Sequence, residues 1–298
     1  MTQKTEYIND LETVLQAWAL RGEAPALYHM MRIAAPRLMR SFEVSLRNVV
    51  EYGTSTAARA RRNEVKRENV ISGMLANAQS DSTTLSDSAL GAQASALIVA
   101  GSGTTATTLT YAVWAVMSHA DVRNKLEGEV LNLPEDYTDA LLEKLPYLKA
   151  VILEALRLYG AAPGSLPRVT PSKGMQVKDF FVPAGFIMTT QAYTMHRDAA
   201  VFSDPEKFNP SRFYQKEMTG LQKSAFAPFG GGTRVCLGIH LAEMELRHGL
   251  TEFIRKCGHI ALSDLTTSDS MEMENFFLIS PKSKRCFVRA GKSEVLSS

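Results

Sequence analysis

The chain has 298 residues, which is long enough to bury a large hydrophobic core. Its composition, with 45% hydrophobic and 21% charged residues, is typical of a globular protein, and the net charge of +2 gives no reason to expect a nucleic-acid partner. The three cysteines, Cys236, Cys257 and Cys286, are odd in number and widely spaced, which argues against a disulfide framework and a structural zinc site.

The first 118 residues are predicted to be mostly helical. Residues 1–75 contain amphipathic stretches with apolar residues at three- and four-residue spacing, the basic run at 58–67 is predicted to be a solvated helix face, and 77–88 to be a polar loop. Residues 89–118 carry no charge, so a helix at about 88–118 could be buried in a helical protein or span a bilayer. Its many hydroxyl side chains and its glycines favour the buried helix.

The remainder of the chain is predicted to combine helices with short hairpins. No linker divides it from the first part, so one compact domain is expected. The predicted elements are helices at 121–133, 145–160 and 238–257, a hairpin at 177–193 that turns at Pro183-Ala184-Gly185, an irregular segment at 204–213, and a last hairpin formed by 275–280 and 285–290.

A run rich in glycine and threonine, Ala100-Gly101-Ser102-Gly103-Thr104-Thr105, lies inside the uncharged helix. A phosphate-binding loop would need a lysine that this run lacks. Glycine inside a helix costs about 1 kcal/mol relative to alanine. The two glycines therefore predict a local opening of the helix beside a ligand.

Glu154 and Arg157 lie three residues apart in a strongly apolar helix sequence, VILEALRLYG. Side chains at this spacing share one helix face and can form an ion pair. An exposed pair of this kind contributes little, whereas a buried one must be fully satisfied. The apolar surroundings predict burial, and Arg212 in the PSRF segment is a candidate third member.

The segment AFAPFGGGTRVCLG places Cys236 after three glycines and just before a predicted helix. Glycines let a backbone approach a flat or bulky group, and the helix N-terminus together with Arg234 favours a thiolate. Cys236 could be a nucleophile with His240 as its base. It could equally be the single protein ligand of a metal whose other ligands come from a macrocycle, as in cysteine-ligated heme.

The pattern Phe229-x-x-Gly232-x-Arg234-x-Cys236-x-Gly238 resembles the heme-binding signature of the cytochrome P-450 monooxygenases. Residues 85–290 carry motifs in the family's order, whereas 1–84 correspond only by position to helices that precede the oxygen-binding helix. The resemblance implies a mainly α fold with a minor β region. It also implies that 1–298 form a single partial domain, the C-terminal portion of the P-450 fold, N-terminally truncated and without the family's usual anchor.

The resemblance implies heme b with Cys236 as the thiolate ligand, electrons from NADPH through a reductase, and a structural network of Glu154, Arg157 and Arg212. Thr104 and Thr105 are the implied catalytic residues. The implied heme contacts are Arg168, His196, Phe229, Gly232, Arg234 and Gly238. The implied substrate contacts are Ala96, Ala100, Ser165, Leu166, Phe277 and Leu278. His196 and the substrate positions are also compatible with ordinary core packing.

The implied function is a monooxygenase that inserts one atom of dioxygen into a hydrophobic small molecule, in the style of fungal secondary metabolism. The family usually has an acid immediately before the threonine, where this chain has Gly103, so water, Thr105 or the substrate is expected to complete the proton relay. The alternatives are a heme-binding remnant without turnover and a peroxide-rearranging family member. The expected partners are the substrate, dioxygen and a cytochrome P-450 reductase, with no nucleic acid and no membrane span. The expected location is the cytoplasm or the cytosolic face of the endoplasmic reticulum.

Overall fold

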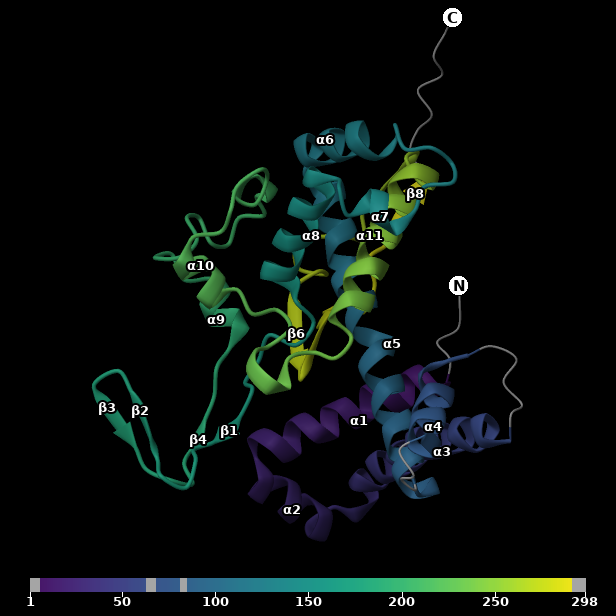
Figure 1. Ribbon diagram of the computed structural model, residues 1–298, viewed down its shortest axis with the longest axis vertical. Helices are drawn as coiled ribbons and strands as arrows, with labels where there is room; N and C mark the ends of the chain where they lie inside the picture. The colour runs from purple at the N-terminus through teal and green to yellow at the C-terminus, as the bar shows by residue number, and fades with distance from the viewer. Residues whose placement is uncertain (1–5, 63–67, 81–84, 291–298) are drawn as a thin grey trace, which may run out of the picture. The chain divides into compact units, whose positions relative to one another are not determined.

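A computed structural model describes residues 6–62, 68–80 and 85–290 of the chain. Parts of the predicted basic helix face and of the predicted polar loop, at 63–67 and 81–84, lie outside the described residues. The chain divides into two compact units, Met1–Gly103 and Thr104–Ser298, and each is described by itself. The long helix α5, Asp87–Ser118, contributes its first half to one unit and its second half to the other (Figure 1).

The first unit is entirely helical over its described residues. Prolines stand at the first positions of α2 and α3, where a missing N–H costs nothing because that group has no intrahelical partner. A small core forms where α3, α4 and α5 meet, and it consists of Ala57, Ala60, Ile71, Leu90 and Ala94. The helices of this unit are α1 (Glu6–Glu23), α2 (Pro25–Ala34), α3 (Pro36–Arg61), α4 (Val70–Ser80) and the first half of α5.

The helices α3 and α5 lie against each other at Gly53 and Ser95. A Cβ atom placed on Gly53 would lie 2.0 Å from the Ser95 hydroxyl and 2.6 Å from the Ser95 backbone nitrogen. These distances are far inside van der Waals contact, and one of the opposing atoms belongs to the backbone. Only glycine allows this helix crossing without a backbone shift.

We therefore expect Gly53→Ala to lower the free energy of unfolding by about 1–3 kcal/mol, because the two helices must separate. Gly73→Ala is the matched control, since Gly73 lies inside α4 and its added methyl group meets no described atom within 4 Å. Alanine is the better helix former, so the control is expected to raise stability by about 1 kcal/mol. Urea titration followed by circular dichroism measures both changes, and equal effects of the two substitutions would contradict the prediction.

The second unit is built around α8, Pro146–Tyr159, a helix of 14 residues of which ten are buried. Leu148, Val151 and Leu156 of this helix pack in one core with Leu250 and Ile254 of α11, which runs beside α8 (Figure 1). The Thr108 hydroxyl of α5 donates a hydrogen bond of 3.1 Å to the Tyr159 carbonyl, which ties α5 to the end of α8. The other helices are α6 (Ala120–Val130), α7 (Asp139–Leu142), α9 (Ala192–His196), α10 (Gly220–Ala225) and α11 (Ile239–Lys256), with short 3-10 turns η1 (Pro210–Arg212) and η2 (Gly232–Arg234).

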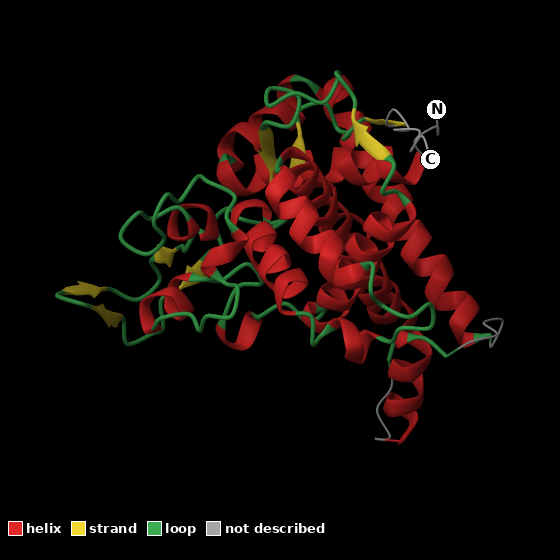
Figure 2. Ribbon diagram, turned by 90° about the horizontal axis from the view of Figure 1, so that it is seen from above, coloured by secondary structure: helices red, strands yellow, loops and turns green. Residues whose placement is uncertain are grey.

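Strands are a minor component and form two-stranded antiparallel pairs in the part of the chain that the structure describes, as the colouring by secondary structure shows (Figure 2). The mainly α fold with a minor β region that the sequence predicts is therefore confirmed. The pairs are β1 (Arg168–Val169) with β4 (Ile187–Met188), β2 (Met175–Val177) with β3 (Phe180–Val182), β5 (Ile260–Leu262) with β8 (Val288–Ala290), and β6 (Met273–Phe276) with β7 (Leu278–Pro281).

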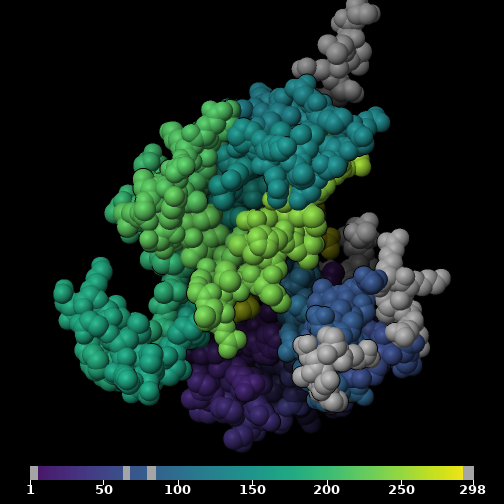
Figure 3. All heavy atoms as spheres, viewed as in Figure 1, coloured from purple at the N-terminus to yellow at the C-terminus, as the bar shows by residue number. Residues whose placement is uncertain are grey.

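Both predicted hairpins are paired differently from the expectation. The first hairpin pairs β2 with β3 and turns at Lys178, which has a φ of 50°, and not at Pro183-Ala184-Gly185. This β2–β3 hairpin extends from the rest of the unit (Figure 3), and its Phe180 and Phe181 side chains are exposed. The pairing predicted for the last hairpin, between 275–280 and 285–290, is wrong as well. The run 275–280 folds back on itself at Phe277, which has a φ of 76°, and 288–290 pairs with β5.

Candidate functional site

The loop that carries Cys236 is a tight turn between α10 and α11. Gly230 and Gly232 have φ values of 74° and 65°, in the left-handed region that glycine adopts without steric strain. The Cys236 amide donates a hydrogen bond of 3.0 Å to the Phe229 carbonyl, and the Gly230 amide donates one of 3.1 Å to the Ala227 carbonyl. The turn thus returns the chain to Phe229 and delivers Cys236 three residues before α11 begins.

The Cys236 thiol is free and exposed. Apolar side chains on either side of it are exposed as well: Val235 is 47% and Leu237 87% exposed. Gly238 follows without a side chain, and a Cβ there would lie 4.0 Å from the Cys236 sulfur. Exposed apolar residues beside a free thiol form a surface suited to a flat, largely apolar group.

The residues present fit a cysteine-ligated heme. The thiol lies near the N-terminus of α11, where the helix dipole favours a thiolate. Arg234 and Arg168 are exposed cations that can pair with carboxylates, and the Arg168 guanidinium already donates to the Pro167 carbonyl at 2.9 Å. Among the described residues there is no cluster of three or more His, Cys, Asp or Glu side chains for a metal. A lone cysteine is also the single protein ligand that a cysteine-ligated heme requires.

Glu154 and Arg157 form a fully buried ion pair on one face of α8. The guanidinium is bidentate, with Nε 2.7 Å and Nη2 2.8 Å from the two carboxylate oxygens. Arg212 donates from Nε to the same carboxylate at 3.0 Å, and the Asn209 amide donates to it at 2.8 Å. The structure thus brings together the three residues of the expected network and satisfies the buried carboxylate with four hydrogen bonds.

The remaining donors of this network hold the irregular segment that follows α9. Arg157 donates to the carbonyls of His196 at 2.7 Å, Pro205 at 2.6 Å and Lys207 at 3.2 Å. Arg212 donates to the Ser203 carbonyl at 3.0 Å. Two arginines therefore fix the backbone of a segment that has almost no regular secondary structure of its own.

His196 is a buried residue whose ring contacts the backbone on both sides. It is 2% exposed, and both ring nitrogens contact backbone groups: Nδ1 lies 2.8 Å from the Arg157 carbonyl, and Nε2 accepts from the Ala227 amide at 2.9 Å. Burial lowers the pKa of His196 to about 4, and the nearby cations Arg157 and Arg197 act in the same direction. Both ring nitrogens thus already have backbone partners, and the heme contact that the resemblance implies for His196 would have to replace one of them.

The segment 161–166 lies beside both the Cys236 loop and the β6–β7 hairpin. A Cβ on Gly230 would contact Leu166 at 3.5 Å, and one on Gly164 would contact the Asn275 side chain at 3.3 Å. The Ile279 amide donates to the Ala161 carbonyl at 2.9 Å. Four expected substrate contacts, Ser165, Leu166, Phe277 and Leu278, therefore lie on elements that are neighbours in the second unit.

The residues predicted on α5 lie on an uninterrupted helix. Residues 100–105 keep regular α-helical structure, so the predicted local opening at Gly101 and Gly103 is not present. Thr104 and Thr105 are half-buried and belong to the second unit, whereas the expected substrate contacts Ala96 and Ala100 are exposed residues of the first. Over the described residues, no helix has both the length and the hydropathy that crossing a bilayer requires.

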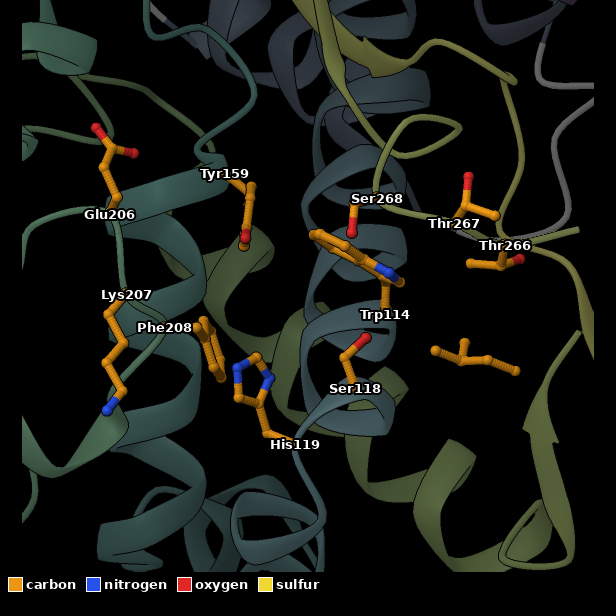
Figure 4. Close-up of a pocket in the computed structure, with 11 residues that line it drawn as sticks. Trp114, Ser118, His119, Tyr159, Glu206, Lys207, Phe208, Thr266, Thr267 and Ser268 are labelled. Carbon is orange, nitrogen blue, oxygen red and sulfur yellow. The ribbon is translucent and has the colours of Figure 1, made fainter. Parts of the chain in front are cut away.

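A separate hollow of about 610 Å³ lies where the end of α5 meets the segment 206–208 and the loop after β5 (Figure 4). Its walls include Trp114, Tyr159 and Phe208, with the His119 ring 5.6 Å from the Phe208 ring. None of the residues predicted from the sequence to contact heme or substrate lines this hollow. We therefore do not assign it to the heme.

Comparison with known proteins shows the family of the chain. A family model described as cytochrome P450 matches residues 6–287. Cytochrome P450 monooxygenase tazI of Aspergillus terreus is 42% identical over 207 residues, which are 69% of this chain and 42% of that protein.

Two further relatives match most of the chain. Cytochrome P450 monooxygenase aflV of Aspergillus parasiticus is 37% identical over 282 residues, 92% of this chain and 55% of that protein. Cytochrome P450 monooxygenase cypX of Dothistroma septosporum is 34% identical over 281 residues, 91% of this chain and 55% of that protein. The chain spans about half the length of the curated relatives it matches. It belongs to the cytochrome P450 family and resembles its fungal members.

Proposed function

We propose that this chain carries the heme-thiolate site of a monooxygenase that oxidises a hydrophobic small molecule in fungal secondary metabolism. The observation that carries the proposal is the free, exposed Cys236 on a glycine turn before α11, within a chain that matches the family over residues 6–287. We further propose that the chain is one partial P450 domain, and that a reductase supplies electrons from NADPH. One oxygen atom enters the substrate and the other leaves as water, with two electrons and two protons consumed.

When bound, heme supplies the oxygen chemistry, and a thiolate ligand favours O–O bond cleavage. The residues of this chain hold and orient it. Cys236 provides the thiolate, while the glycines of its loop allow close approach. Arg234 and Arg168 provide charge-assisted hydrogen bonds to the propionates. Leu166, near Gly230, supplies an apolar contact for the substrate next to the same loop.

Proton delivery is proposed for the hydroxyl groups of Thr104 and Thr105. Both lie half-buried on a regular stretch of α5. The preceding residue, Gly103, has no side chain, so a carboxylic acid cannot supply the proton from that position. A threonine hydroxyl can donate one proton and accept another from water, which makes water the source that completes the relay.

The test is the absorption spectrum of the reduced, carbon-monoxide-bound chain. We expect the wild-type chain to show the red-shifted Soret band of thiolate ligation and Cys236→Ala to lose it entirely. Cys257→Ala is the matched control, because Cys257 lies at the opposite end of α11, and it should keep the band. A heme-saturated chain whose band is unshifted, or is retained in Cys236→Ala, would contradict the proposal.

Gly103 favours a second candidate function, the rearrangement of an organic peroxide. Such a reaction moves an oxygen atom already present in the substrate, so it needs neither the acid that Gly103 replaces nor electrons from NADPH. Incubation of the heme-loaded chain with an organic peroxide, in the absence and presence of a reductase and NADPH, separates the two functions. An oxygenated product formed only with the reductase supports the monooxygenase, and a product isomeric with the peroxide, formed equally without the reductase, supports the rearrangement.

A further inference from the structure

The His196 side chain joins two segments that are far apart in the sequence. Its Nδ1 contacts the carbonyl of Arg157, in the last turn of α8, and its Nε2 contacts the amide of Ala227, at the start of the Cys236 loop. A carbonyl can only accept and an amide can only donate. Nδ1 therefore carries the hydrogen, Nε2 carries the lone pair, and both contacts require a neutral ring.

The ring is held in this orientation from several sides. Arg157 donates from Nη1 to the carbonyl of His196 itself, so the two residues exchange hydrogen bonds between backbone and side chain. The Phe226 ring stacks on the imidazole with centroids 5.3 Å apart and an interplanar angle of 22°. Phe226 also packs against Phe213, the residue after Arg212 of the buried network. The imidazole is therefore an ordered link and not a loosely packed core residue.

The bond to Ala227 lies at the start of the turn that positions the thiol. The Ala227 carbonyl accepts from the Gly230 amide, and the Phe229 carbonyl accepts from the Cys236 amide. A continuous set of hydrogen bonds and short chain segments therefore leads from α8 through His196 to Cys236. Without the hydrogen bond from the Ala227 amide to His196 Nε2, the imidazole would no longer connect the start of this turn to α8.

We propose that His196 is a positioning residue that fixes the start of the Cys236 loop to α8 and so sets the place of the Cys236 thiolate. This role concerns the fold of the loop and can be measured without heme. Only its consequence for thiolate ligation rests on the proposed function. The role differs from that of the Glu154–Arg157–Arg212 network, whose donors reach the His196 carbonyl and the segment 203–207 but, among the described residues, no residue of the loop.

Two substitutions separate the acceptor at Nε2 from the donor at Nδ1. In His196→Gln the longer side chain keeps an amide oxygen near the place of Nε2 and can still accept from Ala227. In His196→Asn the shorter side chain can donate to the Arg157 carbonyl but cannot reach Ala227. His119→Asn is the control for loss of an imidazole elsewhere, since His119, between α5 and α6, contacts the Ala115 carbonyl in the last turn of α5.

The first readout is amide hydrogen exchange in the heme-free chain, measured by NMR for the Ala227 and Cys236 amides. We expect both amides to exchange at least about tenfold faster in His196→Asn than in the wild type, with His196→Gln and His119→Asn close to wild type. Unchanged exchange at Cys236 in a folded His196→Asn chain would overturn the proposal.

If that variant does not fold, Ala227→Pro removes the same donor. Phe226 already has the extended backbone (φ −80°, ψ 95°) that a residue before proline must adopt. Cys236 should then exchange faster to the same degree, and unchanged exchange there would likewise overturn the proposal.

The second readout is the fraction of the reduced, carbon-monoxide-bound chain that has the red-shifted band. We expect His196→Asn to shift a large part of the absorption to the unshifted band and His196→Gln to restore most of it. Equal fractions in both variants and the wild type would show that the loop anchor does not set the thiolate. A wild-type chain without the shifted band would count against the proposed function, while exchange at Cys236 would still decide the role of His196.

Discussion

Replacing Arg157 with leucine is expected to lower the free energy of unfolding by about 3–5 kcal/mol, because it leaves Glu154 as a buried charge without its bidentate partner. Glu154 is fully buried, and two of its four hydrogen bonds come from Arg157. The same substitution removes the donors to the carbonyls of His196, Pro205 and Lys207, which lie in the segment that closes over α8. Arg212 and the Asn209 amide still contact Glu154, so the loss combines the missing bidentate partner of a buried charge with unsatisfied backbone carbonyls.

Urea titration followed by circular dichroism measures this loss. Lys282→Met is the control, because Lys282 forms its ion pair with Asp269 where both side chains are largely exposed. Exposed pairs of this kind contribute about 0–1 kcal/mol, so the control should barely move the midpoint. An Arg157→Leu chain that unfolds within about 1 kcal/mol of the wild type would show that the buried pair is not needed for stability.

Acidification is expected to destabilise the chain by about 3 kcal/mol through His196 alone. The pKa of His196 is about 4 in the folded chain, and an unperturbed histidine has a pKa of 6.5. Between these two values the unfolded chain binds a proton that the folded chain does not. Stability contributed by the neutral ring is thus present above pH 6.5, falls as the pH is lowered through this window, and is fully lost below about pH 4.

The unfolding free energy of the wild type and of His196→Gln, measured at several pH values between 7 and 4, tests this expectation. Glutamine does not titrate, so its curve should lack the His196 component, and the wild-type chain should lose about 3 kcal/mol relative to His196→Gln between pH 7 and pH 4. Asp139, whose pKa is lowered by the hydrogen bond and charge of Arg247, loses its contribution only as the pH falls below the usual carboxyl range. Parallel curves for the two chains would contradict the assignment of the pH dependence to His196.

The parts of the site that could be predicted from the sequence are those in which a residue type at a fixed spacing carries the chemistry. Glu154 and Arg157 share a helix face, and Cys236 stands in a glycine turn before a helix, so both features are visible without a structure. The role of His196 had no such signal. Its two partners are a carbonyl and an amide of the backbone, and every residue other than proline offers both.

The strand pairings could not be predicted for a related reason. A two- or three-residue strand gives little periodicity, and its partner is chosen by contacts made elsewhere in the fold. The turn at Phe277 uses a left-handed conformation that a sequence reader would expect of glycine or asparagine. The opening of the helix predicted at Gly101 and Gly103 is absent, because regular helix continues through both glycines. No described atom lies within 4 Å of a Cβ placed on Gly101, so close packing does not require a glycine there either.

The distance along the chain between α8 and its polar partners also has a consequence for synthesis. Arg157 and Glu154 obtain their partners outside α8 from residues 39 to 58 positions later. At about 5–20 residues per second, a ribosome needs several seconds to make that stretch. During this interval a largely apolar helix carries two charges that cannot yet be buried with their partners. Docking of α8 is therefore expected to be a late step on the ribosome, delayed until the residues up to Arg212 have emerged.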